Sequence, residues 1–173
     1  MLPSEVVERA RSQVGGTHPT KYELGRGGFY PHALTAADSV GRCDCSGFVA
    51  WCLACCRQID HPAYKAELGN WVETSAMVRD ARNSELGMFA LVATDKAEPG
   101  MVYVWGDPKS GRGQGHCGII TEVGEAGPIK VVHCSKGNFT QTGDAIQETN
   151  PSIFVANHAI VARCSHVEHE APA

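Results

Sequence analysis

The sequence predicts an α+β fold with an antiparallel sheet. Helix-like patterns occupy the first half of the chain, and strand-like runs follow from residue 101 onward. This order differs from the alternation of strands and helices that builds parallel sheets. The chain has 173 residues, of which 43% are hydrophobic and 20% are charged. That is enough for one domain with a hydrophobic core and short for two.

Three segments have the apolar spacing or density of helices: Ser4–Val14, Cys45–Arg57 and Asn70–Arg82. Ser4, Asp44 and Asn70 are predicted to cap them, since short polar side chains accept hydrogen bonds from the free amides of a first turn. Glu73 follows Asn70 at the spacing of a capping box. The Gly-, Pro- and His-rich residues 17–42 are predicted to form a structured loop.

Four runs rich in β-branched or aromatic residues predict strands: Met101–Trp105, Cys117–Val123, Ile129–Cys134 and Ile153–Arg163. The sequence GEAGP at residues 124–128 favours a hairpin between the second and third runs. Residues 84–96 match no motif. We expect a single domain over residues 1–165, followed by a flexible polar tail over residues 166–173.

Charge and hydropathy exclude several kinds of partner. The net charge of −4 gives no basic face for nucleic acid. No apolar run approaches the roughly 18 residues of a membrane span. The first residues carry charges where a secretion signal is apolar, so the protein is expected to be cytoplasmic as made. Export by a route that needs no such signal is also compatible with this sequence. A monomer is expected, and whether an immunity or delivery partner exists stays open.

The segment GRCDCSGFVAWCLACC, residues 41–56, holds five of the eight cysteines. Cys45 stands at a predicted helix start, where free amides and the helix dipole favour a thiolate. The small residues Ser46 and Gly47 leave that first turn open, as a cysteine nucleophile requires. A lone cysteine is more often an inert core residue, and we interpret Cys52, Cys55 and Cys56 in that way.

Two histidines strengthen the case for Cys45. His116 opens one predicted hairpin strand and His133 closes the other. If the register pairs them, or offsets them by two residues, both imidazoles share one face and touch, whereas a slip of one residue would separate them. Cys45 would then attack a carbonyl carbon, His116 would manage the proton, and His133 would orient His116.

These residues lie in motifs that resemble those of the NlpC-type cell-wall cysteine peptidases. Asp44-Cys45-Ser46-Gly47-Phe48-Val49 is similar to their D-C-S-G-[FL]-V motif. Gly115–Ile119 resembles G-H-V-G-I, and Val132–Ser135 resembles I-H-A-S. Glu98–Val102 looks like the P-G-D-L-V start of the first barrel strand, with Met101 in place of the aspartate. Together the motifs span roughly residues 5 to 163, in the family's order.

The resemblance implies a papain-like fold, in which the nucleophile helix packs against a small antiparallel barrel or sheet. It implies hydrolysis of amide bonds in peptidoglycan stem peptides, often between D-glutamate and diaminopimelate, by Cys45, His116 and His133. The Cys45 amide is the expected oxyanion donor. Tyr22, or less favourably Tyr30, would be the family tyrosine, and Tyr22, Asp44 and Ser46 are the candidate substrate-binding residues. No cofactor and no metal are expected.

Two kinds of alternative stay open. A zinc site or another thiol-binding module would use the clustered cysteines, but the second Cys-x-x-Cys knuckle that such modules need is missing. A disulfide from Cys43 to Cys52 or a neighbour would require work outside the cell. A papain-like acyltransferase or transglutaminase-like enzyme is the other alternative, although cysteine before histidine favours the peptidase order.

Overall fold

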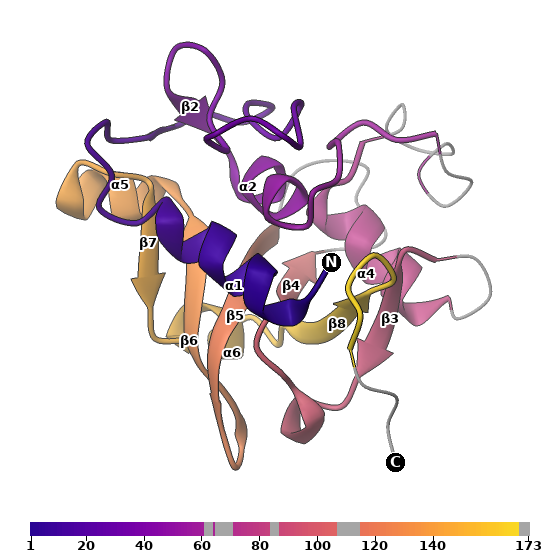
Figure 1. Ribbon diagram of the computed structural model, residues 1–173. Coiled ribbons are helices and arrows are strands. Elements are labelled where there is room, and N and C mark those ends of the chain that lie inside the picture. The colour runs from indigo at the N-terminus through magenta and orange to yellow at the C-terminus, as the bar shows by residue number, and fades with distance from the viewer. Residues whose placement is uncertain (61–63, 65–70, 84–86, 107–114, 170–173) are drawn as a thin grey trace.

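A computed structural model describes residues 1–60, 64, 71–83, 87–106 and 115–169. Figure 1 shows α1 (Pro3–Ser12), α2 (Cys45–Cys52) and α4 (Thr74–Arg82) beside one curved sheet. The short elements are η1 (Thr94–Lys96), α5 (Lys136–Thr142) and α6 (Ser152–Ala156). The α+β class predicted from the order of the patterns is confirmed.

The main sheet has six strands in the order β3-β8-β4-β5-β6-β7, and every neighbouring pair is antiparallel. The strands are β3 (Phe89–Val92), β4 (Val102–Gly106), β5 (Gly115–Gly124), β6 (Gly127–Cys134), β7 (Ile146–Thr149) and β8 (Ile160–Cys164). Two short parallel strands, β1 (Lys21–Tyr22) and β2 (Arg42–Cys43), close the loop before α2. The predicted hairpin is therefore the β5–β6 pair.

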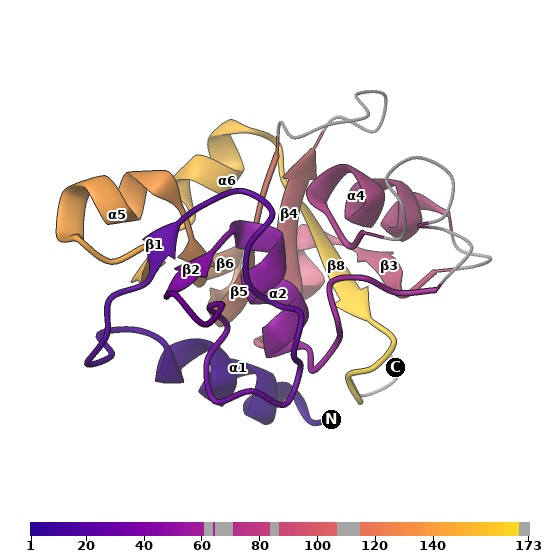
Figure 2. The same ribbon diagram turned by 90° about the horizontal axis from the view of Figure 1, so that it is seen from above.

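Side chains on the two faces of the sheet form two apolar clusters. The larger one joins α1, α2 and α4 to β4 and β5, through residues such as Val49, Val104 and Cys117. The smaller one places Phe154 of α6 against Tyr103 and Ile120. In Figure 2, α6 lies on the opposite side of the sheet from α1. The alternation of strand side chains thus gives each face its own cover.

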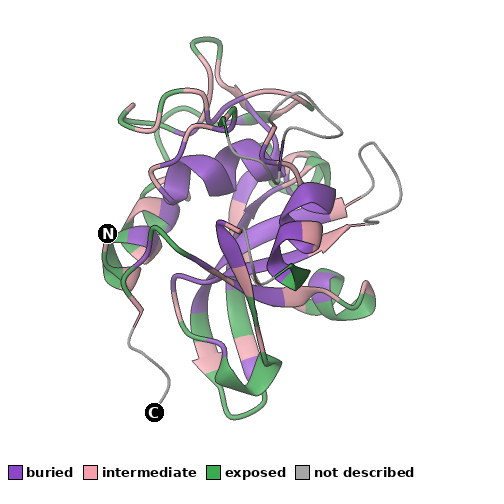
Figure 3. Ribbon diagram, turned by 90° about the vertical axis from the view of Figure 1, so that its right-hand side faces the viewer, coloured by how far each residue is buried: buried purple, intermediate pink, exposed green. Residues whose placement is uncertain are grey.

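Helix α2 is buried along its whole length and appears purple throughout in Figure 3. It ends at Cys52, five residues before the predicted end at Arg57. Ala54 adopts a left-handed backbone conformation (φ 52°), and the chain turns so that the Cys55 amide donates to Ala50 O at 2.9 Å. Cys55 and Cys56 therefore lie beyond the helix. Cys55 still packs in the core as predicted, with 5% exposure, whereas Cys56 is only half-buried.

The helix starts also differ from prediction. Ser4 lies inside α1, whose N-cap is Leu2. Glu73 itself caps α4, because its carboxylate accepts from the amides of Ser75 and Ala76, and the predicted cap Asn70 lies outside the described residues. Helix α4 starts later than predicted because the Glu73 carboxylate satisfies its first-turn amides. Helix α1 starts earlier because Pro3, whose fixed φ suits the first helical position, stands at N1.

The run Ile153–Arg163 is two elements, helix α6 and then strand β8, and the single strand predicted there was wrong. His158, between them, has a positive φ of 52°, which strands do not allow. Beyond residue 165, Val167 is 5% exposed and packs in the core. None of the described helices is long and apolar enough to cross a membrane.

Candidate active site

Cys45 is the first residue of α2, as predicted. Asp44 caps the helix through Oδ1, which accepts from the Gly47 amide at 2.7 Å and from Ser46 Oγ at 3.1 Å. The Cys45 amide has no hydrogen-bond partner within the described part of the chain. A thiol at this position feels the positive end of the helix dipole, and its own amide is free to donate to a substrate oxygen.

Arg57 holds the cap in place from beneath. Its guanidinium donates to Asp44 Oδ2 at 2.9 Å and to Ser46 Oγ at 3.1 Å, with all three side chains buried. It also packs over the Trp71 ring, 4.6 Å from the centroid. Loss of either charged partner would leave a buried unpaired charge, which is far more costly than the pair is favourable. The network fixes where the Cys45 thiol points.

Gly47 is small for a packing reason. A Cβ at this position would lie 2.5 Å from Arg26 O and 2.8 Å from Gly27 O. The loop predicted over residues 17–42 thus runs directly against the first turn of α2. The expectation that Gly47 opens the turn to substrate is replaced by a requirement for close backbone contact.

The β5–β6 register brings the two histidines together. Ile119 pairs with Val132, so His133 lies opposite Gly118, two residues from His116. This is the offset by two that places both imidazoles on one face. His116 Nε2 lies 2.7 Å from His133 Nδ1, and the rings meet edge to face. Both residues are less than a tenth exposed.

Thr149 at the end of β7 determines which nitrogens carry protons. Its hydroxyl donates to Asn150 O at 2.9 Å, so it can only accept from His133 Nε2, also at 2.9 Å. A neutral imidazole has one N–H, so His133 Nδ1 must accept from His116 Nε2–H. His116 Nδ1 is the nitrogen that remains for the side-chain hydrogen bond with Cys45.

Burial, and secondarily the charge of His116, lowers the pKa of His133 to about 3. The ring therefore stays neutral at ordinary pH and keeps Nδ1 as an acceptor. Phe154 supplies much of this apolar surrounding, since its ring stacks on His116 with centroids 5.3 Å apart and meets His133 edge-on at 5.5 Å. Helix α6 thus forms the wall behind the histidine pair.

A second thiol lies beside the first. Cys117 points from β5 toward α2 and is fully buried. Its hydrogen bond to Cys45, followed by the hydrogen bond and charge of His116, lowers the pKa of Cys45 to about 5 against the opposing effect of burial. Burial raises the pKa of Cys117 itself well above the ordinary value. Of the two neighbouring thiols, Cys45 is therefore the one that ionises.

Two cavities flank Cys45 and His116. One, of about 530 Å³, is lined by Cys45, Asp44, Ser46 and Trp71, and the other, of about 600 Å³, by His116, His133 and Lys136. Tyr22 and Gly115 line both. Burial, and then the negative charge of Cys45, raises the pKa of Tyr22, so its hydroxyl remains a donor near the thiol. Tyr30 is 76% exposed and lines neither cavity.

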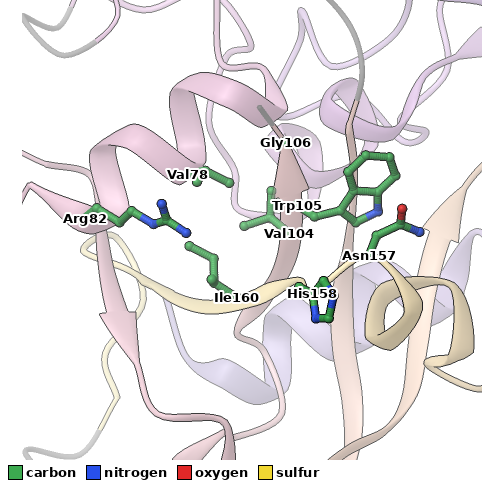
Figure 4. A pocket seen from close by; sticks show the side chains of 8 residues that line it. All are labelled: Val78, Arg82, Val104, Trp105, Gly106, Asn157, His158 and Ile160. Carbon is green, nitrogen blue, oxygen red and sulfur yellow. The ribbon is translucent and has the colours of Figure 1, made fainter. Parts of the chain in front are cut away.

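A third cavity, of about 340 Å³, opens between α4, the end of β4 and the start of β8. Figure 4 shows Arg82 at one end of it and Trp105 and Asn157 at the other. Trp105 also lines the cavity beside His116, so one side chain separates the two spaces. This third cavity contains none of the predicted site residues.

Four of the six predicted residues line the first cavity: Tyr22, Asp44, Cys45 and Ser46. His116 and His133 line the second, together with Tyr22, which therefore joins the two groups. The polar atoms of Asp44 and Ser46 are occupied by the cap and by Arg57. All eight cysteines, each within the described residues, are free thiols. The suggested ligands Cys43, Cys52 and Cys56 join no group of three metal-binding side chains in the described ranges.

Sequence reasoning missed Arg57, Cys117, Thr149 and Phe154 as parts of this site. One feature of the sequence could have indicated Arg57: it is a charged residue at the end of an apolar run. Since a buried arginine needs a partner, a charge at that position predicts a paired side chain. Phe154 was placed in a strand, and Thr149 lay outside every predicted element. Strand alternation turns Cys117 away from His116, toward a helix whose position the sequence does not give.

The family model of the CHAP domain matches residues 36–138, more than half of the chain. The chain belongs to this family of papain-like cysteine peptidase and amidase domains of cell-wall hydrolases. It is a cysteine hydrolase, and its substrate class is peptidoglycan. The papain-like class predicted from the motifs is confirmed, whereas the NlpC-type assignment within it is not. No curated protein sequence matches the chain.

Proposed function

We propose that this CHAP-domain protein is a single catalytic domain that hydrolyses an amide bond of peptidoglycan stem peptides, the bond between D-glutamate and diaminopimelate, through Cys45, His116 and His133. The observation that carries the proposal is the line of hydrogen bonds from His116 through His133 to Thr149, together with the lowering of the Cys45 pKa by His116. Because Thr149 donates its hydroxyl proton to Asn150 O, the donor and the acceptor of each hydrogen bond in this line are fixed. NlpC-type specificity is part of the proposal.

In the first half of the reaction, the Cys45 thiolate attacks the scissile carbonyl carbon. The carbonyl oxygen takes the negative charge and accepts from the Cys45 amide. His116, protonated on Nδ1 and Nε2, then gives the Nδ1 proton to the departing amine as the C–N bond breaks. A thioester on Cys45 and a neutral His116 result.

In the second half, His116 Nδ1 takes a proton from water, and the resulting hydroxide attacks the thioester carbon. The C–S bond breaks and restores the Cys45 thiolate, the protonated His116 and a free carboxylic acid product. His133 never changes charge, because burial keeps it neutral. Its Nδ1 accepts from His116 Nε2–H throughout and so stabilises the charged form of His116.

The lining of the two cavities supports a substrate with carboxylates on one side. Lys136 is exposed at the cavity beside His133, while Glu73 lines the cavity beside Cys45. D-Glutamate and diaminopimelate both carry carboxylates that a lysine attracts. Asp44 and Ser46 we propose as positioning residues for Cys45, since their oxygen atoms are occupied within the protein.

Mass spectrometry of digested stem-peptide fragments tests the function. Cleavage between D-glutamate and diaminopimelate, abolished in C45A and retained in C56A, is expected. Release of the intact stem peptide from the sugar would show that the enzyme is an amidase and not an endopeptidase. Transfer of the acyl group to an added amine without net hydrolysis would overturn hydrolysis itself. The half-buried thiol of Cys56 contacts Phe29 O and lines neither active-site cavity, which makes C56A a matched control.

A further inference from the structure

A second cluster of two thiols and one imidazole lies past the C-terminal end of α2. The ligand atoms of Cys55, Cys164 and His166 all lie within 4.8 Å of one another. They form the one group of three metal-binding side chains found within the described ranges. Cys55 and Cys164 are buried and His166 is exposed. The cluster lines none of the cavities beside Cys45.

The backbone around the cluster is held in place before any ligand arrives. Cys55 follows the left-handed residue Ala54, and its amide donates to Ala50 O. Cys164 ends β8 and pairs with Phe89 of β3. The next turn is closed by the Val167 amide, which donates to Cys164 O at 3.1 Å. Cys164 and His166 thus come from one tight turn. Cys55 comes from a reversal of the chain 109 residues before Cys164 (164 − 55).

The ligand atoms already face one another. Cys55 Sγ lies 2.9 Å from His166 Nδ1, and the Cys55 thiol hydrogen-bonds to Cys164. The backbone amide of His166 donates to the Cys164 sulfur, the kind of second hydrogen bond that orients a metal ligand. A tetrahedral ion with ligands at about 2.0–2.3 Å spaces them roughly 3.5 Å apart, so a small opening of the Cys55–His166 contact accommodates it.

We propose that Cys55, Cys164 and His166 bind one Zn²⁺ ion, with the fourth position left to solvent on the exposed side of His166. Thiolate and imidazole are the ligands of zinc, whereas Ca²⁺ and Mg²⁺ require oxygen. The ion joins the segment after the nucleophile helix to the last strand. This site differs from the zinc module that the Cys43–Cys56 cluster suggests, and it does not depend on the proposed cleavage reaction.

Titration of the purified, reduced, tag-free protein with Zn²⁺ and Co²⁺ tests the site, in a C45A background so that the active-site thiol cannot bind metal. One equivalent of Zn²⁺ is expected, together with a thiolate-to-cobalt absorption band and a rise in Tm of several degrees. C164V and H166Q should remove the band and the Tm rise. C56S and H158Q, a thiol and an exposed histidine outside the cluster, should keep both.

Three results would overturn the proposal. The first is the absence of a thiolate band at saturating Co²⁺, and the second is a band that survives both C164V and H166Q. The third is a disulfide between Cys55 and Cys164 in the protein as isolated, since that bond would consume both ligands. Because His166 is exposed, H166Q is expected to fold even if C164V does not, and the test then rests on H166Q and H158Q.

Discussion

Helix α2 separates two clusters built from the same groups, two thiols and one imidazole. Cys45, Cys117 and His116 lie at its N-terminal end, and Cys55, Cys164 and His166 lie past its C-terminal end. Their surroundings differ in three ways. The first cluster has free amides, a second histidine and a cavity on each side. The second has a carbonyl-rich helix end, one exposed imidazole and none of those cavities.

The difference shows that residue type alone does not decide what a thiol does. The amide end of a helix stabilises a thiolate, and the carbonyl end does not. In the first cluster the imidazole is oriented by a neighbour, so it can move a proton. In the second, the ligand atoms of both thiols and the imidazole lie within 4.8 Å of one another, and such a group suits a cation.

The largest effect is expected for loss of the nucleophile. C45A should lower kcat/KM on stem peptides by about four orders of magnitude or more, since no other group can form the thioester. C55A, the same change in the second cluster, should leave kcat/KM within a few-fold of the wild type. Comparable losses in the two variants, with both folded by circular dichroism, would show that the clusters are not functionally distinct.

The next effect concerns the orientation of the histidine pair. T149V keeps the shape of Thr149 but removes the oxygen that accepts from His133 Nε2. His133 can then take the other tautomer, and kcat should fall by about 10- to 100-fold with KM unchanged. T149S retains the oxygen and should keep most of the activity. A T149V variant with wild-type kcat would contradict the proton arrangement derived above.

A smaller effect is expected from the neighbouring thiol. C117V removes the hydrogen bond that contributes most to the low pKa of Cys45, so that pKa should rise from about 5. Each unit of the rise lowers the thiolate fraction about tenfold below the new pKa. The rate of iodoacetamide alkylation against pH measures this, with C164V as the control. An unchanged dependence of the alkylation rate on pH would mean that Cys117 does not contribute and that His116 alone lowers the pKa of Cys45.

The smallest effect is on acid stability. The pKa of His133 is lowered to about 3, so between its unfolded value near 6.5 and that value the unfolded chain binds the extra proton. Stability should therefore fall as the pH falls through this window, by up to about 1.4 kcal/mol per pH unit. H133Q should flatten that slope in urea unfolding, whereas H158Q should not. A wild-type slope in H133Q would locate the acid sensitivity elsewhere.

Much of the fold could be predicted from the sequence because it depends on local patterns of residues. The nucleophile helix began where Asp44 precedes a run of small and apolar residues, and the β5–β6 hairpin formed around the predicted turn. The run 153–163 was predicted as one strand because α6 and β8 have similar apolar content. The stacking of Phe154 on Tyr103, which holds α6 against the sheet, is a tertiary contact that the local pattern does not encode. Strands β3 and β7 are short edge strands with little pattern of their own.

By itself, the sequence determined the identity of the candidate nucleophile and of its two histidines, since helix capping and strand alternation act over a few residues. Only the tertiary structure decided the register of the hairpin, and therefore that His133 touches His116. It also decided that Cys117 serves Cys45, while Cys55 meets Cys164 and His166. Such contacts join residues far apart in the chain, and no local periodicity encodes the distance between elements that fold against each other.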